Sequence, residues 1–122
     1  MNWDSLIHVA EVMLAPVFVL GGLLTLRNPQ SRADQLARLR LPFPLLLVRL
    51  NAAVMVIAGS ALALNIMPAL ASASLALVLV PTTVVGHAFW IAEGTARQEQ
   101  LAHFIKNVAV LGGLVAMIVA VG

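Results

Sequence analysis

The sequence predicts an all-α integral membrane protein, a bundle of four transmembrane helices formed by residues 1–122 as a single domain. Two observations on composition carry this prediction. Hydrophobic residues make up 61% of the chain and charged residues only 10%, with a mean hydropathy of +1.01. A soluble domain carries about 25% charged residues to cover its surface. Much of a 122-residue chain is surface, so a water-soluble monomer is excluded, because it would expose large apolar patches.

The first predicted helix covers residues 6–26 and ends at Arg27-Asn28-Pro29, where a charge and a proline follow the apolar run. The segment before it, Met1-Asn2-Trp3-Asp4, lacks the basic residues that open a signal peptide. We therefore expect the first helix to be retained in the mature protein.

A polar loop over residues 27–42 follows. Ser31, with Asp34 three residues later, resembles a helix-capping signal. The apolar residues after Ser31 fall mostly on one side and the arginines on the other. This pattern is typical of a short interfacial helix over anionic lipid. A docking surface for a cytoplasmic protein partner is the alternative interpretation of this Arg-rich loop.

The next two helices come from a stretch of 43 residues, Leu50 to Ala92, that contains no Asp, Glu, Lys or Arg. A spanning helix needs about 20 residues, so this stretch belongs to two spans. The break between them is Asn65-Ile66-Met67-Pro68, because a proline favours the first turn of a new helix. The predicted helices are therefore residues 43–66 and 69–92, and a fourth follows over residues 103–121.

The basic residues predict the orientation of these helices. All seven fall on one side of the predicted bundle, and the opposite side, which holds both termini and the turn at 65–68, has none. Basic residues mark the cytoplasmic side of a membrane protein. We therefore expect a multi-pass protein of the bacterial inner membrane with both termini outside the cytoplasm. The seven residues are Arg27, Arg32, Arg38, Arg40, Arg49, Arg97 and Lys106.

Polar residues at membrane depth are costly and point to function. At about 1.5 Å per residue, Arg49 lies roughly 9 Å into its helix and His87 roughly 7 Å into the next, from the same side. His103 and Asn107 share a face of the last helix at i, i+4 spacing. We expect these side chains to converge in the cytoplasmic third of the bundle. The candidate cofactor-binding residues are His87, His103, Arg49, Asn107, Trp90 and Lys106.

Three interpretations of this cluster are open. It is structural if the basic side chains extend to the interface and the histidines hydrogen-bond across helices. It is a headgroup site if imidazole and guanidinium groups donate to a quinone or a lipid. It is a haem site if His87 and His103 are axial ligands, although the chain has no other haem motif.

A second polar pair lies at the other end of the bundle. His8 and Glu11 occupy one face of the first helix at i, i+3 spacing. Glu11 is too far in depth from Arg49 for an ion pair, which leaves His8 as its nearest predicted partner. The pair is interfacial and reached by water, or Glu11 handles protons, or it contacts a neighbouring subunit.

Most catalytic templates are absent. The chain has no cysteine, which excludes disulfides, thiol nucleophiles and thiolate metal sites. It has no HExxH or GxSxG motif and no glycine-rich phosphate loop. The formal charge of +2 gives no indication of nucleic-acid binding, and we expect none.

Three motifs resemble the DoxX family of small bacterial four-helix membrane proteins: His87-Ala88-Phe89-Trp90, His103-Phe104-Ile105-Lys106-Asn107 and Gly112-Gly113. The likeness reaches Leu14-Ala15, Gly21-Gly22, Arg27-Asn28-Pro29, Asn51 and Ala58-Gly59. Glu11 departs from the family, because relatives tend to carry a basic residue just before the Leu-Leu-Ala stretch. If that basic residue has a role in partner binding or redox chemistry in relatives, we do not expect the same role in this chain.

The resemblance implies a subunit of a membrane thiosulfate:quinone oxidoreductase, or a link with redox-stress enzymes held at the membrane. A cysteine-free chain without a flavin or haem motif would not oxidise thiosulfate unaided. We therefore expect a non-catalytic subunit or scaffold of a larger membrane assembly, in contact with the lipid bilayer and with other membrane subunits or copies of itself. The alternative is a quinone-binding subunit of an oxidoreductase. No cofactor is certain, and a quinone or a lipid headgroup is the candidate ligand.

Overall fold

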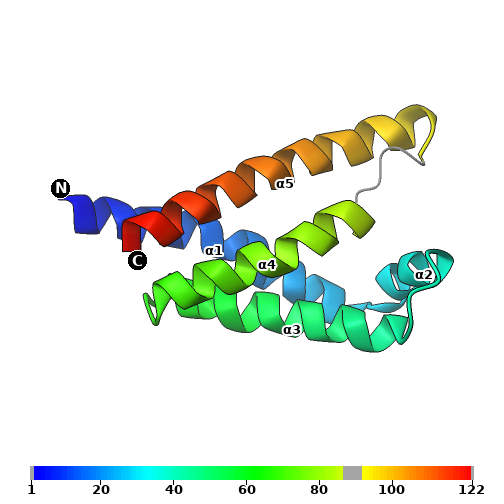
Figure 1. Ribbon diagram of the computed structural model, residues 1–122, viewed down its shortest axis with the longest axis horizontal. Helices are drawn as coiled ribbons and strands as arrows, with labels where there is room; N and C mark the ends of the chain where they lie inside the picture. The colour runs from blue at the N-terminus through cyan, green and yellow to red at the C-terminus, as the bar shows by residue number, and fades with distance from the viewer. Residues whose placement is uncertain (1, 87–91, 122) are drawn as a thin grey trace.

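The computed structural model describes residues 2–86 and 92–121, and within them the chain is all-helical. The helices are α1 (Trp3–Arg27), α2 (Gln30–Arg38), α3 (Pro44–Ala63), α4 (Pro68–Gly86) and α5 (Gly94–Val121). The four long helices run alternately up and down, and α2 lies across one end (Figure 1). We call that end the basic end. The terminal end holds both termini and the α3–α4 turn.

Helices α1 and α3 pack closely because glycines lie at their crossing. A Cβ atom built on Gly22 would lie 2.8 Å from the carbonyl oxygen of Ala52. A Cβ atom on Gly59 would lie 2.9 Å from the side chain of Val19. Only a residue without a side chain fits at these two positions, as small-residue packing between membrane helices requires. The close approach of α1 and α3 therefore depends on Gly22 and Gly59.

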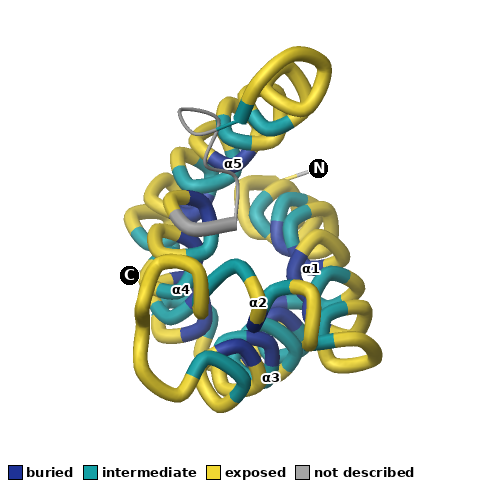
Figure 2. The backbone as a smooth tube through the Cα atoms, turned by 90° about the vertical axis from the view of Figure 1, so that its right-hand side faces the viewer, coloured by how far each residue is buried: buried dark blue, intermediate teal, exposed yellow. Residues whose placement is uncertain are grey.

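The core of the bundle is apolar and draws on all four long helices. Its largest fully buried apolar side chains are Phe18 from α1, Leu62 from α3, Leu75 from α4 and Leu114 from α5. One polar contact joins α3 to α4: the Asn51 amide donates to the Thr82 hydroxyl over 2.9 Å. The buried residues line the inside of the bundle, as the dark segments in Figure 2 show.

The outside of the bundle is also apolar. Large hydrophobic side chains are exposed along every long helix, among them Leu20, Ile57, Leu77 and Val119. In a soluble fold such a surface would aggregate, whereas a lipid bilayer covers it. By length and composition, α1, α3 and α5 each suffice to cross a membrane, and α4 is a shorter apolar helix over Pro68–Val84. The prediction of an all-α membrane bundle is confirmed.

The helix bounds differ from the predicted ones for local reasons. Helix α1 begins at Trp3 because the side chain of Asn2 accepts a hydrogen bond from the backbone N–H of Ser5, over 2.8 Å. Helix α5 begins at Gly94, nine residues before the predicted start at 103. Its first turns are polar, so hydropathy marked the membrane-buried part of the helix and not its beginning. The predicted residues 87–91 of the third span lie outside the described residues.

The predicted cap of the interfacial helix was wrong. Helix α2 begins at Gln30 after Pro29, no side chain caps it, and Ser31 lies inside its first turn. The Asp34 side chain instead accepts a hydrogen bond from the Gln30 side chain over 2.9 Å. The predicted helix is present, and Ala33 is its buried residue against the bundle.

Candidate functional site

A narrow crevice between α4 and α5 holds one of the predicted site residues, Asn107. Its volume is about 170 Å³, and Thr83 from α4 lines it together with Asn107 from α5. Both residues are more than nine-tenths buried. The rest of the lining is apolar: Val80, Val84, Phe104, Val108 and Leu111.

The polar groups of this crevice have spare hydrogen-bonding capacity. No hydrogen bond joins the Thr83 hydroxyl or the Asn107 amide to another side chain in the described part of the chain. Buried polar groups are normally paired, so these two are suited to a polar group on a bound molecule. None of the lining residues is ionisable, so a molecule in this crevice would be held by hydrogen bonds and apolar contacts rather than by charge.

The other predicted site residues do not line this crevice. Arg49 is exposed on α3, because its neighbours Val48 and Ala52 take the buried face. Lys106 and His103 are exposed on α5. His103 shares a helix face with Asn107, but Asn107 is buried whereas His103 is exposed. His87 and Trp90 lie outside the described residues, and their predicted convergence stays a prediction.

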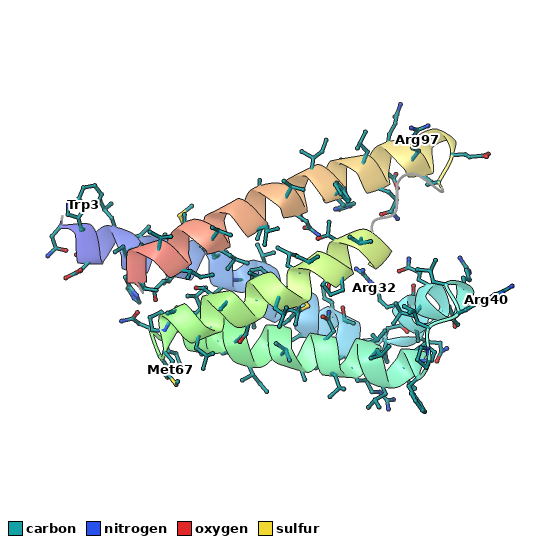
Figure 3. The ribbon with its side chains drawn as sticks, in the orientation of Figure 1. Trp3, Arg32, Arg40, Met67 and Arg97 are labelled. Carbon is teal, nitrogen blue, oxygen red and sulfur yellow. The ribbon has the colours of Figure 1, made fainter. Side chains whose placement is uncertain are left out.

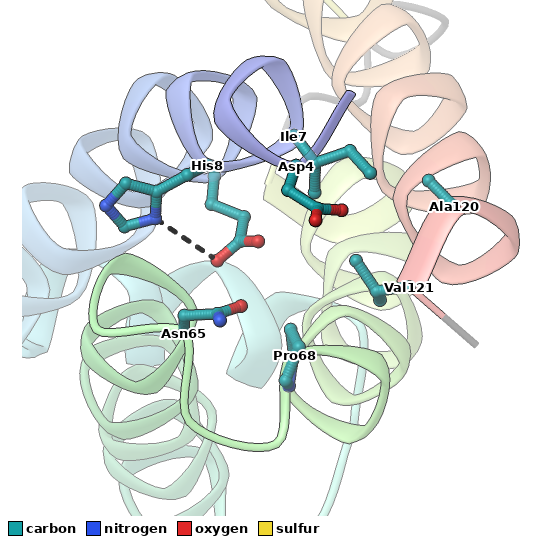
Figure 4. A pocket seen from close by; sticks show the side chains of 8 residues that line it. Asp4, Ile7, His8, Asn65, Pro68, Ala120 and Val121 are labelled. Atoms are coloured by element: carbon teal, nitrogen blue, oxygen red, sulfur yellow. Dashed lines mark ion pairs between the residues drawn. The ribbon is translucent and has the colours of Figure 1, made fainter. Parts of the chain in front are cut away.

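A larger cavity lies at the terminal end, around Glu11. Its volume is about 440 Å³, and it is bounded by α1, the α3–α4 turn and the last turn of α5 (Figure 4). Glu11 is only 1% exposed, which makes it the most deeply buried charged residue among those described. The lining residues are Asp4, Ile7, His8, Glu11, Asn65, Pro68, Ala120 and Val121.

The Glu11 carboxylate has two partners. The Asn65 amide is oriented with its nitrogen toward Glu11, because the opposite orientation would place its oxygen against two acceptors. In this orientation Asn65 donates to both carboxylate oxygens at 3.0 Å. The Nδ1 atom of His8 lies 3.9 Å from the nearer oxygen, as the sequence spacing predicted.

The position of Asn65 follows from the way α3 ends. The backbone N–H of Asn65 donates to Leu62 over 3.1 Å, and that of Ile66 donates to Ala61 over 2.8 Å. This is the Schellman pattern, which requires a residue in the left-handed conformation. Asn65 has φ of 57°, a conformation that asparagine tolerates better than most residues.

From the sequence, Asn65 is predicted only as part of the break at residues 65–68, and its contact with Glu11 is not predicted. A weak signal was present: an asparagine just after an apolar helix is the second choice, after glycine, for this left-handed position. The direction of its side chain depends on where α1 lies, which no local pattern gives.

Comparison with known proteins places the chain in a family. The family model for DoxX matches residues 6–88, about two thirds of the sequence. This chain belongs to the DoxX family. No curated protein and no solved structure matches it.

The match with the DoxX model covers α1 to α4 and so includes Glu11, Asn65, Thr83 and His87. It ends before α5, so the similarity of the His103–Asn107 segment rests on the motif alone. Membership of the DoxX family and the apolar helices together identify a multi-pass membrane protein. No group of three or more His, Asp or Glu side chains that could hold a metal ion occurs among the residues that the structure describes.

Proposed function

We propose that this DoxX protein is a non-catalytic subunit of a larger assembly in the bacterial inner membrane, which packs against the transmembrane helices of other subunits. One observation carries the proposal. Gly112 lies in the middle of α5 on its exposed face, and a Cβ atom built there would meet nothing within 4 Å. No described residue of the chain therefore packs closely against this glycine.

The surroundings of Gly112 fit a helix interface. Ala116 follows at i+4 and is exposed on the same face, which gives the small-xxx-small spacing that lets membrane helices approach closely. Gly22 serves such an approach inside the bundle, because a Cβ atom there would collide with α3. The Gly112–Ala116 face offers the same geometry toward the outside, where a helix of another subunit is the proposed occupant.

The absence of cysteine makes this proposal testable by site-specific cross-linking. A Gly112→Cys variant labelled with benzophenone maleimide in native membranes is expected to give one discrete protein adduct on illumination. Leu20→Cys is the control, since Leu20 is 59% exposed on α1 and is followed at i+4 by the large, exposed Leu24. The mass of the adduct distinguishes a second copy of this chain from a different subunit. Equal cross-linking from both variants, or no protein adduct from the Gly112→Cys variant, would contradict the proposal.

The alternative function is a quinone-binding subunit of an oxidoreductase, such as a thiosulfate:quinone oxidoreductase. The observation in its favour is the α4–α5 crevice, where the Thr83 hydroxyl and the Asn107 amide lie within apolar walls. Such a site suits a neutral ring that bears carbonyl oxygens. This proposal includes a role for the other predicted site residues around the same headgroup: His87, His103, Arg49, Trp90 and Lys106.

Native mass spectrometry of the protein released gently from its membrane separates the two functions, because it weighs small molecules and subunits together. Stoichiometric protein partners without a quinone mass support the scaffold. A quinone adduct that is lost in Asn107→Leu and kept in Ile105→Leu supports the quinone-binding subunit. Ile105 is a suitable control because it is exposed on α5 and lies outside the crevice.

A further inference from the structure

The cavity at the terminal end contains a carboxylate whose hydrogen-bonding capacity is only partly used. An ionised carboxylate offers about four acceptor sites. Asn65 supplies its single amide nitrogen to the two oxygens of Glu11, and the His8 ring at 3.9 Å is beyond hydrogen-bonding distance. A carboxylate that is 1% exposed makes little contact with bulk water. The remaining acceptor sites therefore call for a donor inside the cavity.

No Lys or Arg residue among those described can serve as this donor. All seven Lys and Arg residues lie toward the basic end, and Arg32, Arg40 and Arg97 are seen there in Figure 3, opposite Trp3 and Met67. His8 carries a positive charge only when it is protonated, and its Nδ1 atom at 3.9 Å is too far from Glu11 to donate a hydrogen bond. A second copy in the same membrane orientation would bring its own basic residues to the wrong end. Apart from His8, no cationic side chain among the described residues lies beside Glu11, so another molecule is needed to donate a charged hydrogen bond to it.

The shape of the cavity limits what this molecule is. Its volume of about 440 Å³ falls in the range of small-molecule pockets and far exceeds that of a single ion or water. Ile7, Pro68 and Val121 give it apolar walls, while Asp4 adds a second carboxylate among the lining residues (Figure 4). The cavity thus combines acidic groups with an apolar surface.

We propose that this cavity binds a small organic ammonium compound, with the ammonium group on Glu11 and a short apolar body against Ile7, Pro68 and Val121. Charge-assisted hydrogen bonds to a carboxylate are roughly twice as strong as neutral ones, so Glu11 provides the main anchor. Asn65 holds the carboxylate in place from the α3–α4 turn. The site is separate from the Gly112–Ala116 face and from the α4–α5 crevice, and it does not depend on the function proposed above.

The test uses the three glutamates of the chain, Glu11, Glu93 and Glu99, as reporters. The full-length protein in detergent is labelled with ¹³C at the Glu side-chain carboxyl groups and titrated with n-butylammonium at neutral pH. The Glu11 signal, assigned by its loss in Glu11→Gln, is expected to shift and saturate. Glu93 and Glu99 are internal controls for general ionic effects. n-Butanol, which has a similar apolar body and no charge, is expected to leave the Glu11 signal in place.

A second variant tests the cavity without touching Glu11. Ala120→Phe adds a ring at a lining position and is expected to weaken n-butylammonium binding at least about tenfold. Val119→Phe is the matched control, since Val119 is 78% exposed and lies outside the cavity, and it should bind as the unaltered protein does. The proposal is overturned if all three carboxyl signals shift together without saturation, if n-butanol acts equally, or if Ala120→Phe binds normally. A Glu11 signal that does not move would equally overturn it.

Discussion

Asn65 shows how one residue can serve both the backbone and a buried charge. Its left-handed φ of 57° closes the end of α3, and its amide reaches Glu11 on α1. Glycine would fulfil the first requirement better than asparagine and would fail the second. We infer that the choice of asparagine at this position reflects the contact with Glu11.

The two roles of Asn65 can be separated by substitution. Asn65→Gly keeps the left-handed conformation and removes the amide, so it is expected to destabilise the bundle by about 1–3 kcal/mol through the unsatisfied carboxylate. Asn65→Ala should cost about 1 kcal/mol more, because alanine is strained at this φ. Reversible unfolding in mixed detergent micelles measures both.

A double-mutant cycle tests whether the stability lost in Asn65→Gly comes from the contact with Glu11. In a Glu11→Leu background the carboxylate is absent, so Asn65→Gly should cost much less than in the unaltered chain. An equal cost in both backgrounds would show that the amide of Asn65 serves something other than Glu11.

Arg40, like Asn65, has a left-handed backbone conformation, but its side chain makes no contact in the described part of the chain comparable to that of Asn65 with Glu11. It closes α2 in the Schellman pattern with φ of 59°, and it is exposed. Arg40→Gly is expected to stabilise the end of α2 by about 1 kcal/mol, measured as slower hydrogen exchange of the α2 amides.

Arg38 provides the matched comparison, because Arg38→Gly removes the same charge two residues earlier. Arg38 lies in the last turn of α2, where glycine costs about 1 kcal/mol of helix stability. Opposite effects of the two variants on α2 exchange would support a conformational cause. Changes of the same sign would point to the lost charge instead.

At the scale of whole elements, the close packing of α1 on α3 decides which glycine matters. Gly22→Ala gains about 1 kcal/mol of helix propensity but places a methyl group 2.8 Å from the carbonyl oxygen of Ala52. Backbone cannot yield as a side chain can, and overpacking costs about 1–3 kcal/mol. We therefore expect Gly22→Ala to destabilise the bundle in the same unfolding measurement.

Gly21→Ala is the control at the neighbouring position. Its Cβ atom would lie 3.4 Å from the flexible end of Met55, an ordinary contact. This variant should be neutral or slightly stabilising. If both substitutions destabilise equally, the α1–α3 distance in solution is not set by Gly22.

At the scale of the whole molecule, the separation of charge between the two ends predicts orientation. The arginines of α2 and the start of α5 lie at the basic end, and both termini lie at the other (Figure 3). We propose, by the positive-inside rule, that the basic end faces the cytoplasm. A reporter enzyme that is active only outside the cytoplasm should then be active when fused after Gly122, and a cytoplasmic reporter at the same position should be inactive. The reverse result would overturn this orientation.

The candidate sites were only partly predictable, because sequence spacing gives contacts within one helix and not contacts between helices. Helical spacing gave the His8–Glu11 pair, because both residues are on one helix three positions apart. It did not give the Asn65–Glu11 contact, which joins residues 54 positions apart and depends on how α1 packs against the α3–α4 turn. Similar depth in the membrane was the reason to expect Arg49 near His87, which lies outside the described residues. Among the other members of the predicted cluster, Arg49 is exposed on α3 while Asn107 is buried on α5. Depth fixes the position along a helix axis and leaves rotation about that axis open.

The sequence alone determined that this is a membrane protein, that it is all-helical and that its basic residues gather at one end. These properties are sums over many residues, and no single contact can change them. Tertiary structure decided which side chains lie together: Glu11 contacts Asn65 beside a cavity, Asn107 and Thr83 line one crevice, and a Cβ atom on Gly112 would meet none of the described residues. In an apolar helix almost every face is hydrophobic, so the sequence pattern hardly distinguishes the face that packs from the face that meets lipid. Only the fit of small residues such as Gly22 and Gly59 settles that choice.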